Sequence, residues 1–144
     1  MSMKSWTEPG YGFRLYTGDN LGKIREFIMG NIGCLKNPPV VITNELFKYI
    51  YEAEDEAELE DALDYPVPWM VAEIIRAKEG QTCGVKGYRS DGDTDQEAML
   101  GIEPSYPWQT EYRSQEDCDL LLATYAEQLG ITEKPDYFDA EYYG

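Results

Sequence analysis

One stretch of the chain, Asn44 to Asp64, constrains the fold more than any other, with the sequence NELFKYIYEAEDEAELEDALD. Alanine, glutamate and leucine dominate it and are good helix formers, so we predict a helix over residues 44–63. Its second half carries eight acidic residues and no base. These residues are Glu52, Glu54, Asp55, Glu56, Glu58, Glu60, Asp61 and Asp64.

The same acidic residues oppose a continuous helix. Carboxylates four residues apart, such as those of Glu52 and Glu56 or of Glu56 and Glu60, repel each other by roughly 0.2–0.5 kcal/mol per pair. The apolar stripe of the first half also slips at Ala57. We therefore expect a break near Asp55.

The density of these charges motivates a functional hypothesis. At a rise of about 1.5 Å per residue, the acidic half of the helix carries one charge every ~2.3 Å. Duplex DNA carries one charge per ~1.7 Å of its axis. We expect a phosphate-like surface for a basic partner, with Glu52, Glu56 and Glu60 in one solvent-facing row. The alternative is a solvated helix face that only increases solubility.

The charge of the whole chain is banded, with a net value of −16. Residues 44–64 hold nine acids and one base, and residues 91–144 hold fourteen acids and two bases. The segments between and before them are mildly basic. Such a field repels nucleic acid and anionic membranes and attracts cationic proteins.

Length and pattern predict one α+β domain spanning residues 1–144. Helices are expected at residues 20–32, 44–63, 68–79 and 114–129, and short strands at 12–16, 40–43 and 83–88. The proline and glycines between Trp6 and Gly12 predict a lead-in turn, and Ser90 to Thr110 predicts a long loop.

The chain has no histidine and three widely spaced cysteines. There is no C-x-x-C pair, so neither a zinc site nor a disulfide framework is expected. Cys118 lies on an apolar stripe between Asp117 and Asp119, which predicts a buried, unreactive thiol. No apolar run has the length of a signal-peptide core or a membrane span. We expect a cytoplasmic protein with reduced thiols.

The segment Asp91–Asp95 has the alternate acidic spacing of a calcium loop. Gln96 stands where that loop needs glycine and Ile102 where it needs glutamate, so an acidic surface loop is the better interpretation. We expect this loop to supply a second row of partner-binding carboxylates. These are Asp91, Asp93, Asp95 and Glu97.

Several aromatic residues would suit a protein interface if they were exposed, although packing in the core or against proline is the default. They are Tyr65, Trp69, Tyr106, Trp108 and Tyr112.

The C-terminal segment resembles a known family. Its features are Asp117-Cys118-Asp119 at the start of a helix, Tyr125 within it, Gly130 at its end, and Pro135 before the closing YFDAEYYG. This segment is similar to the last part of the ArdA-type antirestriction proteins of mobile elements. The resemblance implies an acidic DNA mimic that inhibits type I restriction enzymes.

We therefore expect a protein without enzymatic activity, cofactor or metal. It would occupy the nucleic-acid-binding site of a basic bacterial defence enzyme, of the restriction or CRISPR-effector kind, without itself binding nucleic acid or membrane. Two alternatives stay open. One is an immunity protein or antitoxin that neutralises a basic toxin, and the other is a small enzyme or accessory domain whose acidity is incidental.

Overall fold

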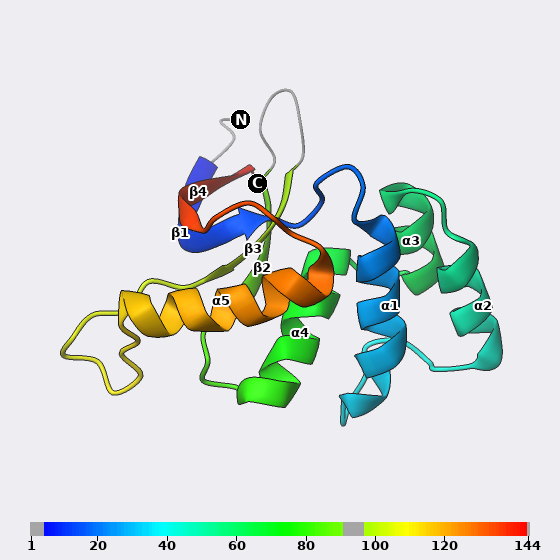
Figure 1. Cartoon of the computed structure of the whole chain (residues 1–144), viewed down its shortest axis with the longest axis horizontal. Helices are drawn as coiled ribbons and strands as arrows, with labels where there is room; N and C mark the ends of the chain where they lie inside the picture. Colours follow the sequence, from blue (N-terminus) through cyan, green and yellow to red (C-terminus); the bar gives the residue numbers. More distant parts are fainter. Residues whose placement is uncertain (1–4, 91–96, 144) are drawn as a thin grey trace.

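The structure, a computed structural model, describes residues 5–90 and 97–143 (Figure 1). In chain order the elements are β1 (Ser5–Arg14), α1 (Leu21–Asn31), a short 3-10 helix (Ile32–Cys34), α2 (Asn44–Glu52), α3 (Glu56–Leu63), α4 (Val67–Glu79), β2 (Val85–Ser90), β3 (Glu97–Ile102), α5 (Gln115–Leu129) and β4 (Asp136–Tyr143). One antiparallel sheet with helices packed on it makes the fold α+β, as predicted.

Strand β1 is the centre of the sheet, whose order is β2-β3-β1-β4. It pairs with β4 from Ser5 opposite Tyr143 to Gly12 opposite Asp136. Only its last part also pairs with β3. The first and last strands of the chain therefore lie side by side, and the sheet depends on pairing between residues far apart in sequence.

Two glycines of β1 allow the strands to pack closely. A Cβ atom on Gly12 would lie 2.0 Å from the carbonyl oxygen of Leu100, and one on Gly10 would lie 2.6 Å from Cζ of Phe138. Phe138 of β4 in turn meets the ring of Tyr88 of β2 edge-on, with centroids 4.9 Å apart. The sheet is thus curled, because side chains from its two edge strands touch across one face.

The helices cover the other face of the sheet. Phe13, Val85 and Leu100 project from it into the main core, which is completed by apolar residues of α1, α4 and α5. Asn20, a buried polar residue, joins two of these helices to the sheet. Its side-chain amide donates to the carbonyl oxygens of Leu15 and Leu129, at 2.8 and 2.9 Å.

Several predicted helix ends are confirmed. The hydroxyl of Thr43 accepts a hydrogen bond from the backbone N–H of Leu46 at the start of α2. The hydroxyl of Ser114 does the same for Asp117 in α5. Gly130 ends α5 with a φ of 70°, in the left-handed region that favours glycine.

The strand predicted at residues 40–43 is wrong. Val40 packs partly against the core, but Val41 is 81% exposed, and the segment joins no strand of the described part of the chain. The other two predicted strands are confirmed in part, since residues 83–88 overlap β2 and residues 12–16 overlap the end of β1. The rest of the sheet comes from residues predicted as a turn or a long loop and from the C-terminal segment.

The helices α2 and α3 form one end of the molecule along its longest axis (Figure 1). Helix α1 packs against α2 and α4, and the connection between β3 and α5 reaches the opposite end of the molecule. The acidic segment therefore lies at the surface, at one end of the molecule.

Candidate functional site

The acidic segment is two helices rather than one, as the expected break near Asp55 requires. Helix α2 ends at Glu52 and α3 begins at Glu56. Arg25 of α1 stabilises the end of α2, because its guanidinium donates to the carbonyl oxygens of Tyr51 and Ala53. The positive charge of Arg25 also interacts favourably with the negative, C-terminal end of the helix dipole.

The start of α3 makes structural use of its carboxylates. Asp55 accepts a hydrogen bond from the backbone N–H of Glu58 at 2.8 Å, and Glu58 reaches back to accept from the N–H of Glu54 at 2.6 Å. This reciprocal arrangement caps the helix. Acidic side chains are also favourable near the positive end of the helix dipole. The break thus converts part of the repulsion in a continuous helix into stabilisation.

The predicted solvent-facing row of Glu52, Glu56 and Glu60 is wrong. The break separates Glu52 from the other two, and Glu60 is half-buried. Both carboxylate oxygens of Glu60 accept from the guanidinium of Arg89 on β2. One of them also accepts from the backbone N–H of Val67. Glu60 is therefore committed to the fold, which the sequence pattern did not indicate.

Glu56 lies beside this pair. Partial burial raises the pKa of its carboxyl group, with Arg89 acting in the opposite direction and Glu60 in the same one. Burial also raises the pKa of the Tyr16 hydroxyl, and the charges of Glu56 and Glu60 add to that effect. The side of α3 that faces the body of the protein is thus held by the ion pair between Glu60 and Arg89, with Glu56 close to it.

The other seven predicted carboxylates of this segment are exposed. They are Glu52, Glu54, Asp55, Glu56, Glu58, Asp61 and Asp64. Within residues 5–90 and 97–143, none of the seven forms an ion pair with a base. We call these seven residues the acidic surface.

A groove between α2 and α3 gives part of the acidic surface a concave shape. Its volume is about 580 Å³. Three carboxylates, an exposed tyrosine and two alanines line it. These residues are Glu52, Glu58, Asp61, Tyr49, Ala53 and Ala62. An apolar floor with carboxylates at its rim suits the aliphatic stem and charged end of a lysine or arginine.

Sequence reasoning missed two exposed tyrosines of α2, of which Tyr49 lines this groove. Tyr49 is 55% exposed and Tyr51 is 71% exposed. The available signal was their position, because Leu46 and Ile50 define the buried stripe of α2 and both tyrosines lie off it. Tyrosine is enriched in protein interfaces.

Of the second predicted row of carboxylates, only Glu97 lies within the described residues. Asp91, Asp93 and Asp95 lie outside the described residues, and Glu97 is exposed at the first position of β3. Farther along the chain, Glu133 is paired with Arg14 and Glu103 with Lys86. These two carboxylates of the second acidic band are therefore partly neutralised, unlike the acidic surface.

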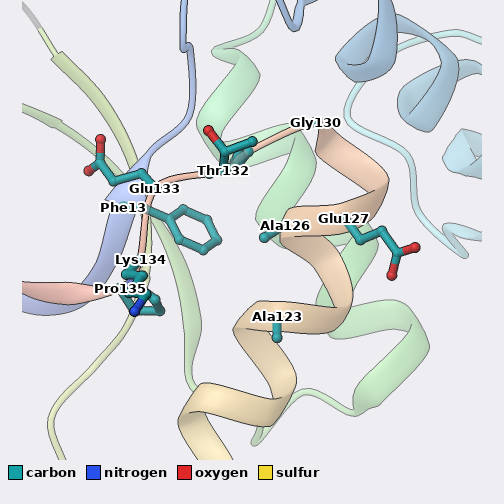
Figure 2. A pocket seen from close by; sticks show the side chains of 10 residues that line it. Phe13, Ala123, Ala126, Glu127, Gly130, Thr132, Glu133, Lys134 and Pro135 are labelled. Carbon is teal, nitrogen blue, oxygen red and sulfur yellow. The ribbon is translucent and has the colours of Figure 1, made fainter.

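A second hollow, of about 510 Å³, lies between α5 and residues 130–135 (Figure 2). The ring of Phe13 faces Ala126 across it, while the side chains of Glu127 and Glu133 point away from the ring. Its polar groups do not converge on a point, so its shape suits an apolar group better than a reaction.

The described residues contain no group of three or more acidic, cysteine or histidine side chains arranged to hold a metal ion. The three cysteines are free. Cys118 is buried as predicted, and burial raises the pKa of its thiol.

Among the described residues, no helix combines the length and hydropathy needed to cross a membrane. No protein-family model, curated protein or solved structure matches the chain.

Proposed function

We propose that this protein is a cytoplasmic, non-enzymatic inhibitor whose acidic surface occupies the nucleic-acid-binding site of a bacterial defence enzyme. The target would be of the restriction or CRISPR-effector kind. The observation that carries the proposal is the acidic surface itself, seven exposed carboxylates on one end of the molecule with no base paired to them in the described part of the chain.

The positions of the arginines support this proposal. Arg25, Arg76 and Arg113 donate to backbone carbonyl oxygens instead of carboxylates. Arg14 and Arg89 pair with Glu133 and Glu60, neither of which belongs to the acidic surface. None of these five arginines forms an ion pair with the acidic surface, which leaves its carboxylates available to an external cation.

The mechanism would be competitive occupancy without turnover. Carboxylates of the acidic surface would replace phosphates against lysine and arginine side chains of the target. Helix α3 is about 12 Å long at its eight residues, which spans several phosphates of duplex DNA. The resemblance of the C-terminal segment to antirestriction proteins supports the same class of target.

One observation favours a second candidate, an immunity protein or antitoxin for a basic toxin. Tyr49 lines the groove, and Tyr51 is exposed two residues farther along α2. Tyrosines at the centre of an interface carry partner-specific affinity, which a general mimic of DNA does not need. The two candidates share the charge and differ in whether duplex DNA competes for the partner.

The test is a capture experiment. The immobilised protein is exposed to bacterial lysate at low salt, and bound proteins are eluted with duplex DNA or with high salt. The proposal expects nucleic-acid-binding enzymes in the DNA eluate, and inhibition of their DNA binding by the free protein. Capture of a partner that excess duplex DNA fails to displace would reject DNA mimicry and support the immunity candidate.

A further inference from the structure

The connection between β3 and α5 exposes a stacked pair of aromatic rings. Trp108 is 79% exposed and Tyr106 is 53% exposed. Their ring centroids lie 4.8 Å apart and their planes differ by 5°. This connection lies at the opposite end of the molecule from the acidic surface (Figure 1), so the pair belongs to a different surface.

Arg113 fixes the base of this connection. Its guanidinium donates to the carbonyl oxygens of Thr82 at 3.0 Å, Glu111 at 2.9 Å and Glu103 at 3.3 Å. It packs against Gly84, where a Cβ atom would lie 2.4 Å from Cζ of Arg113. The positive charge of Arg113 is therefore used to hold the backbone in place.

Hydrogen bonds also fix the segment that carries the two rings. The backbone N–H of Tyr106 donates to the side-chain oxygen of Gln109 at 2.7 Å, and the N–H of Gln109 donates to the carbonyl oxygen of Tyr106 at 2.9 Å. The hydroxyl of Ser105 accepts from the N–H of Arg113 at 3.0 Å. An aromatic pair held in this way loses little conformational entropy when it binds a partner.

Trp108 also lines a groove of about 450 Å³, to which Tyr106 does not contribute. The rest of the lining is mostly polar. It consists of Glu103, Pro104, Ser105, Gln109, Thr110, Glu111 and Arg113. The groove therefore combines an indole ring that is stacked on a neighbour with carboxylates and amide groups.

Charge complementarity identifies the occupant. The net charge of −16 disfavours phosphates, nucleic acid and acidic peptides. Within the groove, Glu111 is an exposed acid without an ion pair to a described base, and Glu103 is an exposed acid that also pairs with Lys86 at 3.4 Å. The guanidinium of Arg113 already donates to three carbonyl groups. Tryptophan is the best aromatic partner for a cation. Arginine suits this site better than lysine, because its planar group stacks on a ring and donates to carboxylates at the same time.

We propose that the Trp108 groove binds an arginine side chain on a basic protein or peptide. This contact is separate from the acidic surface and does not require that surface to mimic DNA. It would give the protein a second attachment point, with a preference for arginine over lysine that carboxylates alone do not produce.

The probes are an arginine-glycine repeat peptide and a lysine-glycine repeat peptide of the same length, titrated by calorimetry at low salt. We expect the wild-type protein to bind the arginine peptide more tightly. Trp108→Ala should weaken that binding by about two- to fivefold, the size of an exposed cation–π contact, and remove the preference. Leu120→Ala, a change at a residue that is 64% exposed on α5, should leave both affinities unchanged. Circular dichroism checks that each variant is folded.

Two results would overturn the inference: an equal affinity of the wild-type protein for both peptides, or an arginine preference that survives Trp108→Ala. The double reversal Glu52→Lys and Asp61→Lys separates this outcome from the proposed function. That change should weaken both peptides alike if the acidic surface binds cations, whatever Trp108 does. If Trp108→Ala removes the arginine preference and the double reversal changes neither peptide's affinity, the Trp108 groove is supported and the acidic surface is not.

Discussion

Arg89 on β2 binds the carboxylate of Glu60 on α3 through both terminal nitrogens, one of them at 3.0 Å. Each side chain is 24% exposed. This contact joins the acidic end of the molecule to the sheet across a separation of 29 residues. It also separates Glu60, which is half-buried and holds α3 to the sheet, from the seven predicted carboxylates that face solvent.

Glu60→Gln should destabilise the protein. The substitution removes the charge from a partly buried pair of hydrogen bonds and leaves Arg89 without its counter-ion. Loss of such charge-assisted bonds costs about 1.5–3 kcal/mol in free energy of unfolding. Asp61→Asn, a matched loss of charge at an exposed position of the same helix, should change stability by about 0.5 kcal/mol or less. Urea denaturation measures both.

Whether Glu60→Gln lowers or raises stability shows which interaction of Glu60 dominates, its attraction to Arg89 or its repulsion from Glu56. If Glu60 mainly repelled Glu56, its neutralisation would increase stability by a few tenths of a kcal/mol. A stabilised Glu60→Gln variant would therefore contradict the structural role of the pair.

Gly12→Ala should be among the most damaging small substitutions in the sheet. A Cβ atom there would overlap the carbonyl oxygen of Leu100, and overpacking costs about 1–3 kcal/mol or more. Gly30→Ala is the matched control in α1, because nothing lies within 4 Å of its added Cβ atom. That change should stabilise the protein by about 0.5–1 kcal/mol. Equal effects of the two substitutions on the urea midpoint would contradict the close strand packing.

The helices were predictable from sequence because their signals are local. The caps at Thr43 and Ser114, the stop at Gly130 and the break before Glu56 depend on neighbours within a few residues. Each was therefore visible in the order of the amino acids.

Most of the sheet was not predictable in this way. Gly10 and Gly12 indicate a turn when only their sequence neighbours are considered. They lie in β1 because it pairs with the distant strands β3 and β4, whose residues Leu100 and Phe138 pack closely against them. Val40 and Val41 have the composition of a strand, but composition does not supply a partner strand. Long-range pairing decided both cases.

The sequence shows which acidic residues make up the candidate site, but not how each of them is placed in the fold. The exposure of Asp61 follows from its place between the buried Leu59 and Leu63. The partial burial of Glu60 could not be predicted, because its partner Arg89 lies on β2, which follows the next helix in the chain.

Stability should decrease steeply in alkaline solution. The hydrogen bond to Asp119, at 2.6 Å, together with burial raises the pKa of Tyr11 from 10 to about 12. Burial also raises the pKa of Tyr88 and of Tyr125. An unfolded tyrosine ionises near pH ~10, while these side chains keep their protons in the folded state. Their contribution to stability is therefore complete below pH ~10 and is lost as pH rises through the folded pKa values.

Tyr11→Phe tests this relationship, because it removes one of these groups without removing its ring. Stability measured by urea denaturation at a series of alkaline pH values should fall less steeply in the variant than in the wild-type protein. Parallel pH profiles would show that the Tyr11 hydroxyl ionises normally in the folded state.

Reversing two charges of the acidic surface should weaken binding of the partner and leave the fold intact. Glu52→Lys with Asp61→Lys reverses two exposed charges that line the α2–α3 groove and make no hydrogen bond to another described residue. The fold should be retained, since surface changes of this kind alter stability by about 0.5 kcal/mol or less. Binding to the captured partner should weaken by about tenfold or more, because two attractive contacts become repulsive.

The matched control is Glu127→Lys with Asp139→Lys, which changes the net charge equally at exposed positions outside the α2–α3 groove. If binding depended only on total charge, both double variants would weaken it alike. Placement on the acidic surface predicts a large effect of the first pair and a small effect of the second. Wild-type affinity should also fall as salt rises, since salt screens contacts between exposed charges. Binding that survives both the first reversal and high salt would show that the partner recognises a different surface.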